Sequence, residues 1–158
     1  MILLDTNTCI YIINAKPAAV LARFQQYRLG DIGLCSVVAA ELAFGVAKSG
    51  SVRNRQALEM FLAPLSAPRP AEAARPPWES SKVAKPHLLE SILPFDDAAL
   101  WTYGDLRADL ERRSTPIGAL DTMIAAHALS QHAMLVTNNT REFAKVPGLQ
   151  LDNWVAEM

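Results

Sequence analysis

Two kinds of segment alternate along the chain. Short, mainly apolar segments, typical of buried strands, occupy residues 1–4, 32–35, 92–95 and 134–137, and a last edge strand is expected near residues 149–151. The segments between them predict helices, at about residues 7–14, 17–27, 51–65 and 99–113, and at further positions beginning after Ser36, near Ala119 and before Phe143. Strands that alternate with helices indicate an α/β fold whose central sheet is mostly parallel, with helices on both faces.

Polar residues at the segment boundaries predict how the helices begin. Thr6 or Asn7 is expected to cap the first helix, and Ser36 the helix that carries Glu41. The acidic pair at residues 96–97 offers a cap for the helix that follows. The expected caps divide the chain into helices and strands of the length found in α/β domains.

One window departs from this pattern. Seven of the ten prolines lie between Pro64 and Pro94, and prolines at this density prevent a continuous helix or central strand. We predict a single domain over residues 1–158 in which residues 66–91 are an inserted, mobile, dispensable surface segment, because long loops cost little closure entropy. A second hypothesis is that Trp78 and residues 87–89 pack onto a neighbouring molecule.

Composition sets broad limits. The chain has 158 residues, of which 51% are hydrophobic and 20% charged, as in an ordinary globular domain. A net charge of −1 neither indicates nor excludes nucleic-acid binding. Cys9 and Cys35 lack metal-ligand spacing and fit buried thiols in a reducing cytosol. No leader pattern or apolar stretch of about 20 residues occurs, so we expect a cytoplasmic protein without membrane association.

Three acids stand in apolar surroundings. Asp5 follows a buried run, Glu41 is the one charge in SVVAAELAFGVA, and Asp121 interrupts IGALDTMIAAHAL. A buried carboxylate costs several kcal/mol unless it is compensated, and no basic residue is close in sequence. A shared cation would explain all three, since Mg²⁺ and Mn²⁺ prefer carboxylate oxygens. The acids and Asn139 are expected beyond the carboxyl ends of the strands.

Other interpretations exist for each acid. Asp5 alone fits a helix cap, Asp121 a first-turn acid favoured by the helix dipole, and Glu41 an exposed stripe with Gly45 and Lys48. A haloacid-dehalogenase-type phosphatase is disfavoured because residue 7 is asparagine where that class has a second aspartate. No G-x-S-x-G elbow or glycine-rich phosphate loop is present, and the histidines at 127 and 132 fall on different helix faces, as packing or surface residues do.

The four segments MILLDTNTCIYII, VVAAELAFGVAKS, TPIGALDTMIAAHALSQ and LVTNNTREFAKVPGLQLDNW resemble the PIN-domain VapC toxins, over residues 1–65 and 92–158. The resemblance implies a PIN-like fold and an endoribonuclease dependent on Mg²⁺, with Mn²⁺ as a substitute. It assigns Asp5, Glu41 and Asp121 to the metal site and Asn139 to its fourth position. It leaves open whether one ion or two act. Residues implied to orient the acids or waters are Thr6, Asn7, Thr137 and Asn138.

The resemblance also implies the reaction and the partners. A metal-bound water attacks the phosphodiester in line and leaves a 5′-phosphate and a 3′-hydroxyl. Implied partners are an RNA substrate, a VapB-type antitoxin, a second copy in a homodimer, higher assemblies with the antitoxin, and operator DNA reached through the antitoxin. The candidates for RNA-backbone contacts are Lys48, Arg53, Arg55, Arg141 and Lys145. The alternatives are a PIN-type RNA-processing nuclease without an antitoxin and a catalytically silent PIN binding module.

Overall fold

The computed structural model describes residues 1–27, 31–66 and 89–155. Its five strands are β1 (Ile2–Leu4), β2 (Ile32–Cys35), β3 (Leu89–Leu93), β4 (Met134–Val136) and β5 (Leu151–Asp152). Its helices are α1 (Thr6–Ile13), α2 (Ala18–Phe24), α3 (Ser36–Ser49), α4 (Val52–Ser66), α5 (Asp97–Arg112), α6 (Ala119–Ser130) and α7 (Thr140–Phe143). The α/β prediction is confirmed.

The sheet has the strand order β3-β2-β1-β4-β5, and every pair is parallel. The chain builds outward from β1 to β2 and β3, then returns to the other side of β1 with β4 and β5. The carboxyl ends of β1 and β4 are therefore neighbours at the point where the strand order reverses, the usual place for a site in an open α/β sheet. Sequence patterns predicted the strands but not this order.

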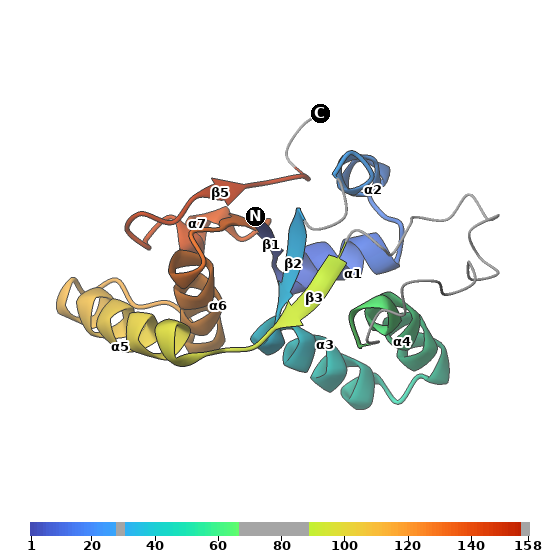
Figure 1. Cartoon of the computed structure of the whole chain (residues 1–158), viewed down its shortest axis with the longest axis horizontal. Helices are drawn as coiled ribbons and strands as arrows, with labels where there is room; N and C mark the ends of the chain where they lie inside the picture. Colours follow the sequence, from blue (N-terminus) through green and yellow to red (C-terminus); the bar gives the residue numbers. More distant parts are fainter. Residues whose placement is uncertain (28–30, 67–88, 156–158) are drawn as a thin grey trace.

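Helices cover both faces of the sheet, as predicted. Figure 1 shows α5 and α6 on one side of the strands and α1, α2 and α4 on the other, with α3 crossing at the end where β2 finishes. Fully buried aliphatic and aromatic side chains from both layers form one core, among them Leu3, Leu34, Leu135, Phe24 and Phe143. Burying residues of this size stabilises the fold by roughly 1.5–3 kcal/mol each.

Two predicted caps are wrong. Asp5, rather than Thr6 or Asn7, is the N-cap of α1, and its side chain accepts a hydrogen bond from the Thr6 amide. Cys35 is the N-cap of α3, because Ser36 already belongs to the helix and its hydroxyl accepts from the amide of Phe95 at 3.1 Å. Asp96 caps α5 through the amide of Ala99, as predicted. Each of these two helices begins one residue earlier than expected, at Thr6 and Ser36, so the residue before it takes the cap position.

The proline-rich segment lies mostly outside the described residues. Its predicted limits of 66–91 need correction at the edges, because Ser66 ends α4 and residues 89–91 belong to β3. The strand predicted at 92–95 thus begins earlier, where it pairs with β2 through Ile32 and Leu89. Backbone pairing with a neighbouring strand extends β3 into a stretch whose own pattern did not indicate a strand.

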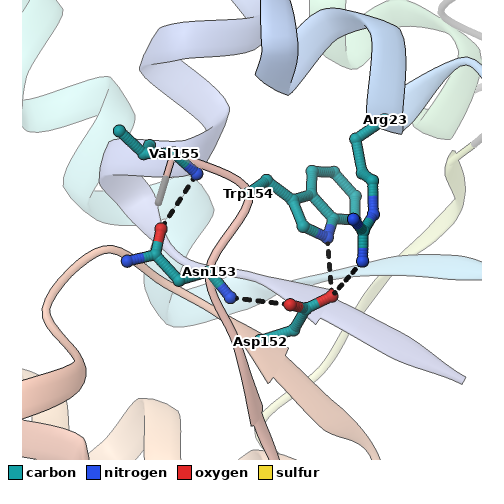
Figure 2. Close-up of polar contacts among 5 residues, drawn as sticks. All are labelled: Arg23, Asp152, Asn153, Trp154 and Val155. Atoms are coloured by element: carbon teal, nitrogen blue, oxygen red, sulfur yellow. Dashed lines mark hydrogen bonds and ion pairs between the residues drawn. The ribbon is translucent and has the colours of Figure 1, made fainter. Parts of the chain in front are cut away.

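A cluster of side chains joins the last strand to α2. In Figure 2 the Oδ2 atom of Asp152 accepts hydrogen bonds from Arg23 Nη2 at 3.3 Å and from Trp154 Nε1 at 3.0 Å. The Trp154 ring is buried and stacks on Tyr27 with centroids 5.4 Å apart. β5 is only two residues long, and these contacts add to its backbone pairing with β4.

Candidate metal centre

Asp5 lies at the centre of the candidate site because of the sheet topology. It follows β1 directly, and its amide donates to the carbonyl of Val136, the last residue of β4, at 3.0 Å. The side chain is 5% exposed and leaves the sheet at the edge that the carboxyl ends of β1 and β4 share. The residue after β4, Thr137, is fully buried beside it.

Both oxygens of the Asp5 carboxylate are held. Oδ1 accepts from the Thr6 amide and Oδ2 from the Thr137 hydroxyl, each at 2.7 Å. Burial raises the pKa of Asp5, the two hydrogen bonds oppose this, and the charge of Glu41 adds a smaller rise. Thr6 and Thr137, predicted to orient the acids, thus contact them in the structure.

Glu41 reaches the same site from α3. Its Oε2 atom accepts a hydrogen bond of 2.5 Å from the hydroxyl of Thr6. Thr6 therefore connects two acids, with its amide on Asp5 and its hydroxyl on Glu41. Because α3 begins at the carboxyl end of β2, which pairs with β1, the helix starts beside the residue that follows β1. Glu41 is half-buried here, not part of an exposed stripe.

Asp121 lies in the first turn of α6, where its charge is favoured by the helix dipole. The chain before it approaches closely, since a Cβ atom built on Gly118 would lie 3.4 Å from Asp121 Oδ2. Burial raises the pKa of Asp121, and the charges of Asp5, Glu41 and Glu142 raise it further. The three predicted acids therefore lie close enough to repel one another.

The electrostatics of this cluster match a cation's requirements. Within residues 1–27, 31–66 and 89–155, no basic side chain lies at ion-pair distance from Asp5, Glu41 or Asp121. In the same ranges, no three acidic, histidine or cysteine side chains converge on one ion position. The cluster supplies only oxygen donors, whose mutual repulsion a divalent cation would offset. The donor chemistry fits Mg²⁺, and the carboxylates would need to turn inward to share it.

The asparagines take different positions. Asn139 contacts the site through its backbone amide, which donates to Thr137 Oγ1 at 3.0 Å. Asn138 donates to the Tyr11 hydroxyl at 2.9 Å, and its Oδ1 is buried without a hydrogen-bond partner among the described residues. Asn7 is exposed, and the described part of the chain offers it no side-chain hydrogen bond. Orientation of acids or waters by Asn138 and Asn7 stays a prediction.

Sequence reasoning missed Glu142. This residue lies in α7, one turn after Asn139, and its charge contributes to the raised pKa of Asp121. Its carboxylate also pairs with Lys145 Nζ at 2.7 Å. A carboxylate three residues beyond Asn139 on a helix was a signal in the sequence, but the surrounding TREF segment is polar, so the acid did not stand out.

The predicted RNA contacts are at the surface. Lys48, Arg53, Arg55 and Arg141 are exposed, and Arg55 pairs with Glu59 at 3.2 Å. Lys145 is partly buried through its pair with Glu142. Arg141 lies on α7, the helix that carries Glu142, Lys145 follows just after it, and the other three belong to α3 and α4. Contact of any of them with RNA stays a prediction.

A buried contact joins the two helices that carry Glu41 and Asp121. His127 of α6 is fully buried, and its Nδ1 lies 3.0 Å from the Sγ of Cys35, the residue before α3. Phe95 packs edge-on against the imidazole, with centroids 5.9 Å apart. His127 Nε2 has no hydrogen-bond partner among the described residues. The predictions of a packing role for His127 and of buried thiols for Cys9 and Cys35 are confirmed.

His127 predicts a pH dependence of stability. Burial lowers its pKa below 6.5, and the nearby charge of Asp96 opposes this only in part. Below about pH 6.5 the unfolded chain binds a proton that the folded protein resists, so stability falls as the pH drops toward the folded-state pKa. We expect urea unfolding from pH 7 to 5 to show a smaller loss in His127→Gln than in wild type. His132→Gln, at an exposed site, is the control. If stability fell with pH as steeply in His127→Gln as in wild type, His127 would not be the source of this pH dependence.

The fold and the acid cluster define a PIN domain, and the chain matches the PIN domain family over residues 2–149. Two relatives extend this similarity. The chain is 34% identical over 154 residues to Ribonuclease VapC2 of Rickettsia felis and 36% identical over 153 residues to a tRNA(fMet)-specific endonuclease VapC of Shigella flexneri, covering 96% of both chains each time. The chain belongs to the VapC ribonucleases of the PIN-domain family.

A solved structure agrees over the whole length. The DNA-bound VapBC from Salmonella typhimurium contains a chain with 33% sequence identity and a TM-score of 0.74, and the match covers 98% of this chain and 99% of that one. The predicted PIN-like fold and the resemblance to VapC are thereby confirmed. Separately, none of the helices in the described ranges is long and apolar enough to cross a membrane.

Proposed function

We propose that this protein is the toxin of a toxin–antitoxin pair, a cytoplasmic endoribonuclease that needs Mg²⁺, or Mn²⁺ in its place, to cleave RNA. The observation that carries the proposal is the buried Asp5 carboxylate, held by Thr6 and Thr137 close to the charges of Glu41 and Asp121, with no basic partner among the described residues. A protein tolerates such repulsion where a cation is bound. The Shigella flexneri relative is named for tRNA(fMet), so transfer RNA is the first substrate to test.

The chain's own residues divide the work at this site. Asp5, Glu41 and Asp121 would hold the cation, with Glu142 as a fourth acid beside Asp121 and Asn139 as an uncharged neighbour. When bound, the cation supplies charge to polarise the scissile phosphate and to lower the pKa of a water molecule. The Thr6 amide and the Thr137 hydroxyl fix the Asp5 carboxylate, and the Thr6 hydroxyl fixes Glu41. Such outer contacts orient the acids before the substrate arrives.

Substrate and protein partners follow from the same proposal. Exposed cations on α7 and on α3 and α4 contact the RNA backbone, which binds basic side chains without regard to sequence. The similar Salmonella structure is a VapBC bound to DNA. This supports a VapB-type antitoxin as partner, with operator DNA reached through the antitoxin. The toxin forms a homodimer within that assembly.

RNA cleavage tests the proposal directly. We expect purified protein to cleave transfer RNA in Mg²⁺, to lose cleavage in EDTA, and to regain it when Mg²⁺ or Mn²⁺ is restored. Asp5→Asn should reduce the rate at least about 10³-fold, because a bound cation contributes several kcal/mol to phosphoryl chemistry. Asp31→Asn, which removes a charge just before β2, is the matched control. Equal cleavage by wild type and Asp5→Asn would identify a contaminating nuclease and contradict the proposal.

A further inference from the structure

Asp152 lies next to the candidate metal centre along the carboxyl edge of the sheet. It ends β5 and pairs in register with Val136, the last residue of β4. Its backbone carbonyl accepts a hydrogen bond from the amide of Thr137 at 3.0 Å. Since the Thr137 hydroxyl donates to Asp5 Oδ2 at 2.7 Å, Thr137 alone connects Asp152 to an expected ligand of the cation.

Thr137 transmits position because it has little freedom of its own. It is fully buried, and a side chain branched at Cβ has few allowed rotamers. Its hydroxyl accepts from the backbone amide of Asn139 at 3.0 Å and gives its one proton to Asp5. The direction of that proton depends on where the Thr137 backbone lies, and the Asp152 carbonyl is one of the groups that hold this backbone.

The strand that supplies this carbonyl is short. β5 has two residues, and in the described part of the chain it is an edge strand that pairs with β4 alone. Short elements at the margin of a structure open more readily than its core. Contacts made by the Asp152 side chain can therefore add to the backbone pairing in fixing residue 152.

Three donors hold the Asp152 carboxylate (Figure 2). Oδ2 accepts from Arg23 Nη2 at 3.3 Å and from Trp154 Nε1 at 3.0 Å. Oδ1 accepts from the backbone amide of Asn153 at 2.8 Å. Hydrogen bonds to an ionised carboxylate are stronger than those between neutral groups, so the three together restrain the side chain.

Two of these donors are themselves anchored in the fold. Trp154 is 3% exposed, and its ring stacks on Tyr27 with the planes at 15°. Arg23 belongs to α2, and its neighbour Phe24 is fully buried in the core. The ion pair between Arg23 and Asp152 is partly exposed, and such a pair adds little to stability by itself. Its larger consequence is where residue 152 lies.

We propose that Asp152 is a positioning residue of the candidate metal centre, which acts on Asp5 through Thr137. Arg23 and Trp154 hold its carboxylate, and its carbonyl holds Thr137 in the orientation in which the hydroxyl reaches the acid. The inference rests on the proposed metal-dependent ribonuclease function. It extends the site from the acids to β5 and α2, whose residues would affect the affinity for the cation without touching it.

The affinity for Mg²⁺ tests this role. Asp152→Asn keeps the shape of the side chain but replaces one acceptor by a donor. We expect the Mg²⁺ concentration for half-maximal RNA cleavage to rise about three- to tenfold, less than the 10- to 100-fold typical of a residue that touches a metal ligand directly. The rise in melting temperature that Mg²⁺ produces without RNA should shrink in parallel. Trp154→Phe, which keeps an aromatic ring and changes no charge, should move both measurements in the same direction by a smaller factor.

A double-mutant cycle shows whether the effect passes through Thr137. Thr137→Val removes the hydroxyl that reaches Asp5. If Asp152 acts through that hydroxyl, adding Asp152→Asn to Thr137→Val should change the half-saturating Mg²⁺ concentration by less than about twofold. Losses that multiply in the double variant would mean that Asp152 acts independently of Thr137, and would contradict the proposal.

Asp109→Asn and Trp101→Phe are the matched controls. Asp109 also pairs with two arginines but lies on α5, and Trp101 is 72% exposed on the same helix. Both variants should keep the Mg²⁺ dependence of wild type. The same Mg²⁺ dependence in Asp152→Asn and Trp154→Phe would contradict the positioning role and leave the ribonuclease intact.

The thermal measurement separates this role from the proposed function. If wild type gains thermal stability with Mg²⁺ but cleaves no RNA, the ribonuclease is contradicted, and a smaller gain in Asp152→Asn would still support the positioning role. If wild type shows neither a thermal gain nor cleavage with Mg²⁺ or Mn²⁺, both are contradicted.

Discussion

Replacement of Asp121 by asparagine is expected to abolish RNA cleavage and, at the same time, to stabilise the metal-free protein. The first effect should be at least about 10³-fold, because the variant loses a ligand of the cation on which the chemistry depends. The second follows from the raised pKa of Asp121, caused by burial and then by Asp5, Glu41 and Glu142. A carboxylate whose folded-state pKa is raised opposes folding when it is ionised.

The direction of the pKa shift of Asp121 predicts how the stability difference between Asp121→Asn and wild type depends on pH. At neutral pH Asp121 is ionised in the folded protein at a cost, and asparagine removes that cost. As the pH falls through the raised pKa of Asp121, the wild-type carboxyl takes up a proton and the cost of its charge is removed. The stability difference between the variant and wild type therefore shrinks, and it disappears below the unfolded-state pKa of 3.8. Thermal unfolding in EDTA should therefore show Asp121→Asn above wild type at pH 7 and equal to it in strong acid.

Added Mg²⁺ should make wild type more stable to heat than Asp121→Asn. A ligand that binds only the folded state stabilises it, so wild type should gain thermal stability with Mg²⁺ while Asp121→Asn gains little. Asp105→Asn, at an exposed position on α5, is the control that changes the same charge away from the cluster. Retained cleavage in Asp121→Asn, or a lower melting temperature than wild type in EDTA at pH 7, would contradict the role given to Asp121.

Replacement of Thr137 by valine should weaken both activity and stability. Valine keeps the shape of threonine but removes the hydroxyl that donates to Asp5 Oδ2 and accepts from the Asn139 amide. Loss of an outer contact of this kind typically costs 10- to 100-fold in activity or metal affinity. The unsatisfied buried groups should lower the free energy of unfolding by about 1–3 kcal/mol.

Thr137→Ser separates the hydroxyl from the rest of the side chain. It retains the hydrogen bond to Asp5, and we expect it to keep most of the activity and the Mg²⁺ affinity of wild type. The measurements are RNA cleavage rates at several Mg²⁺ concentrations and urea unfolding in EDTA. Equal activity in Thr137→Val and wild type would show that Asp5 does not depend on this contact.

The predictable part of the site came from residues that are costly where they stand. Asp5, Glu41 and Asp121 interrupt apolar segments, and the expense of a buried charge marks them without any knowledge of the fold. Glu142 was not predicted, because an acid in a polar helix carries no burial cost that would mark it.

The sequence by itself determined the alternation of strands and helices, the α/β class and the three acids, because hydrophobic periodicity and the cost of burying charge are local properties of the chain. Only the tertiary structure decided the strand order, the start of β3 at Leu89, the caps at Asp5 and Cys35, and the contacts of Thr137 with Asp5. These features depend on which carbonyl, hydroxyl or charge of another segment lies next to each residue in the folded protein. Pairings between distant segments, such as Thr137 with Asp5, 132 residues apart, are set when the sheet assembles, so no pattern within one segment encodes them.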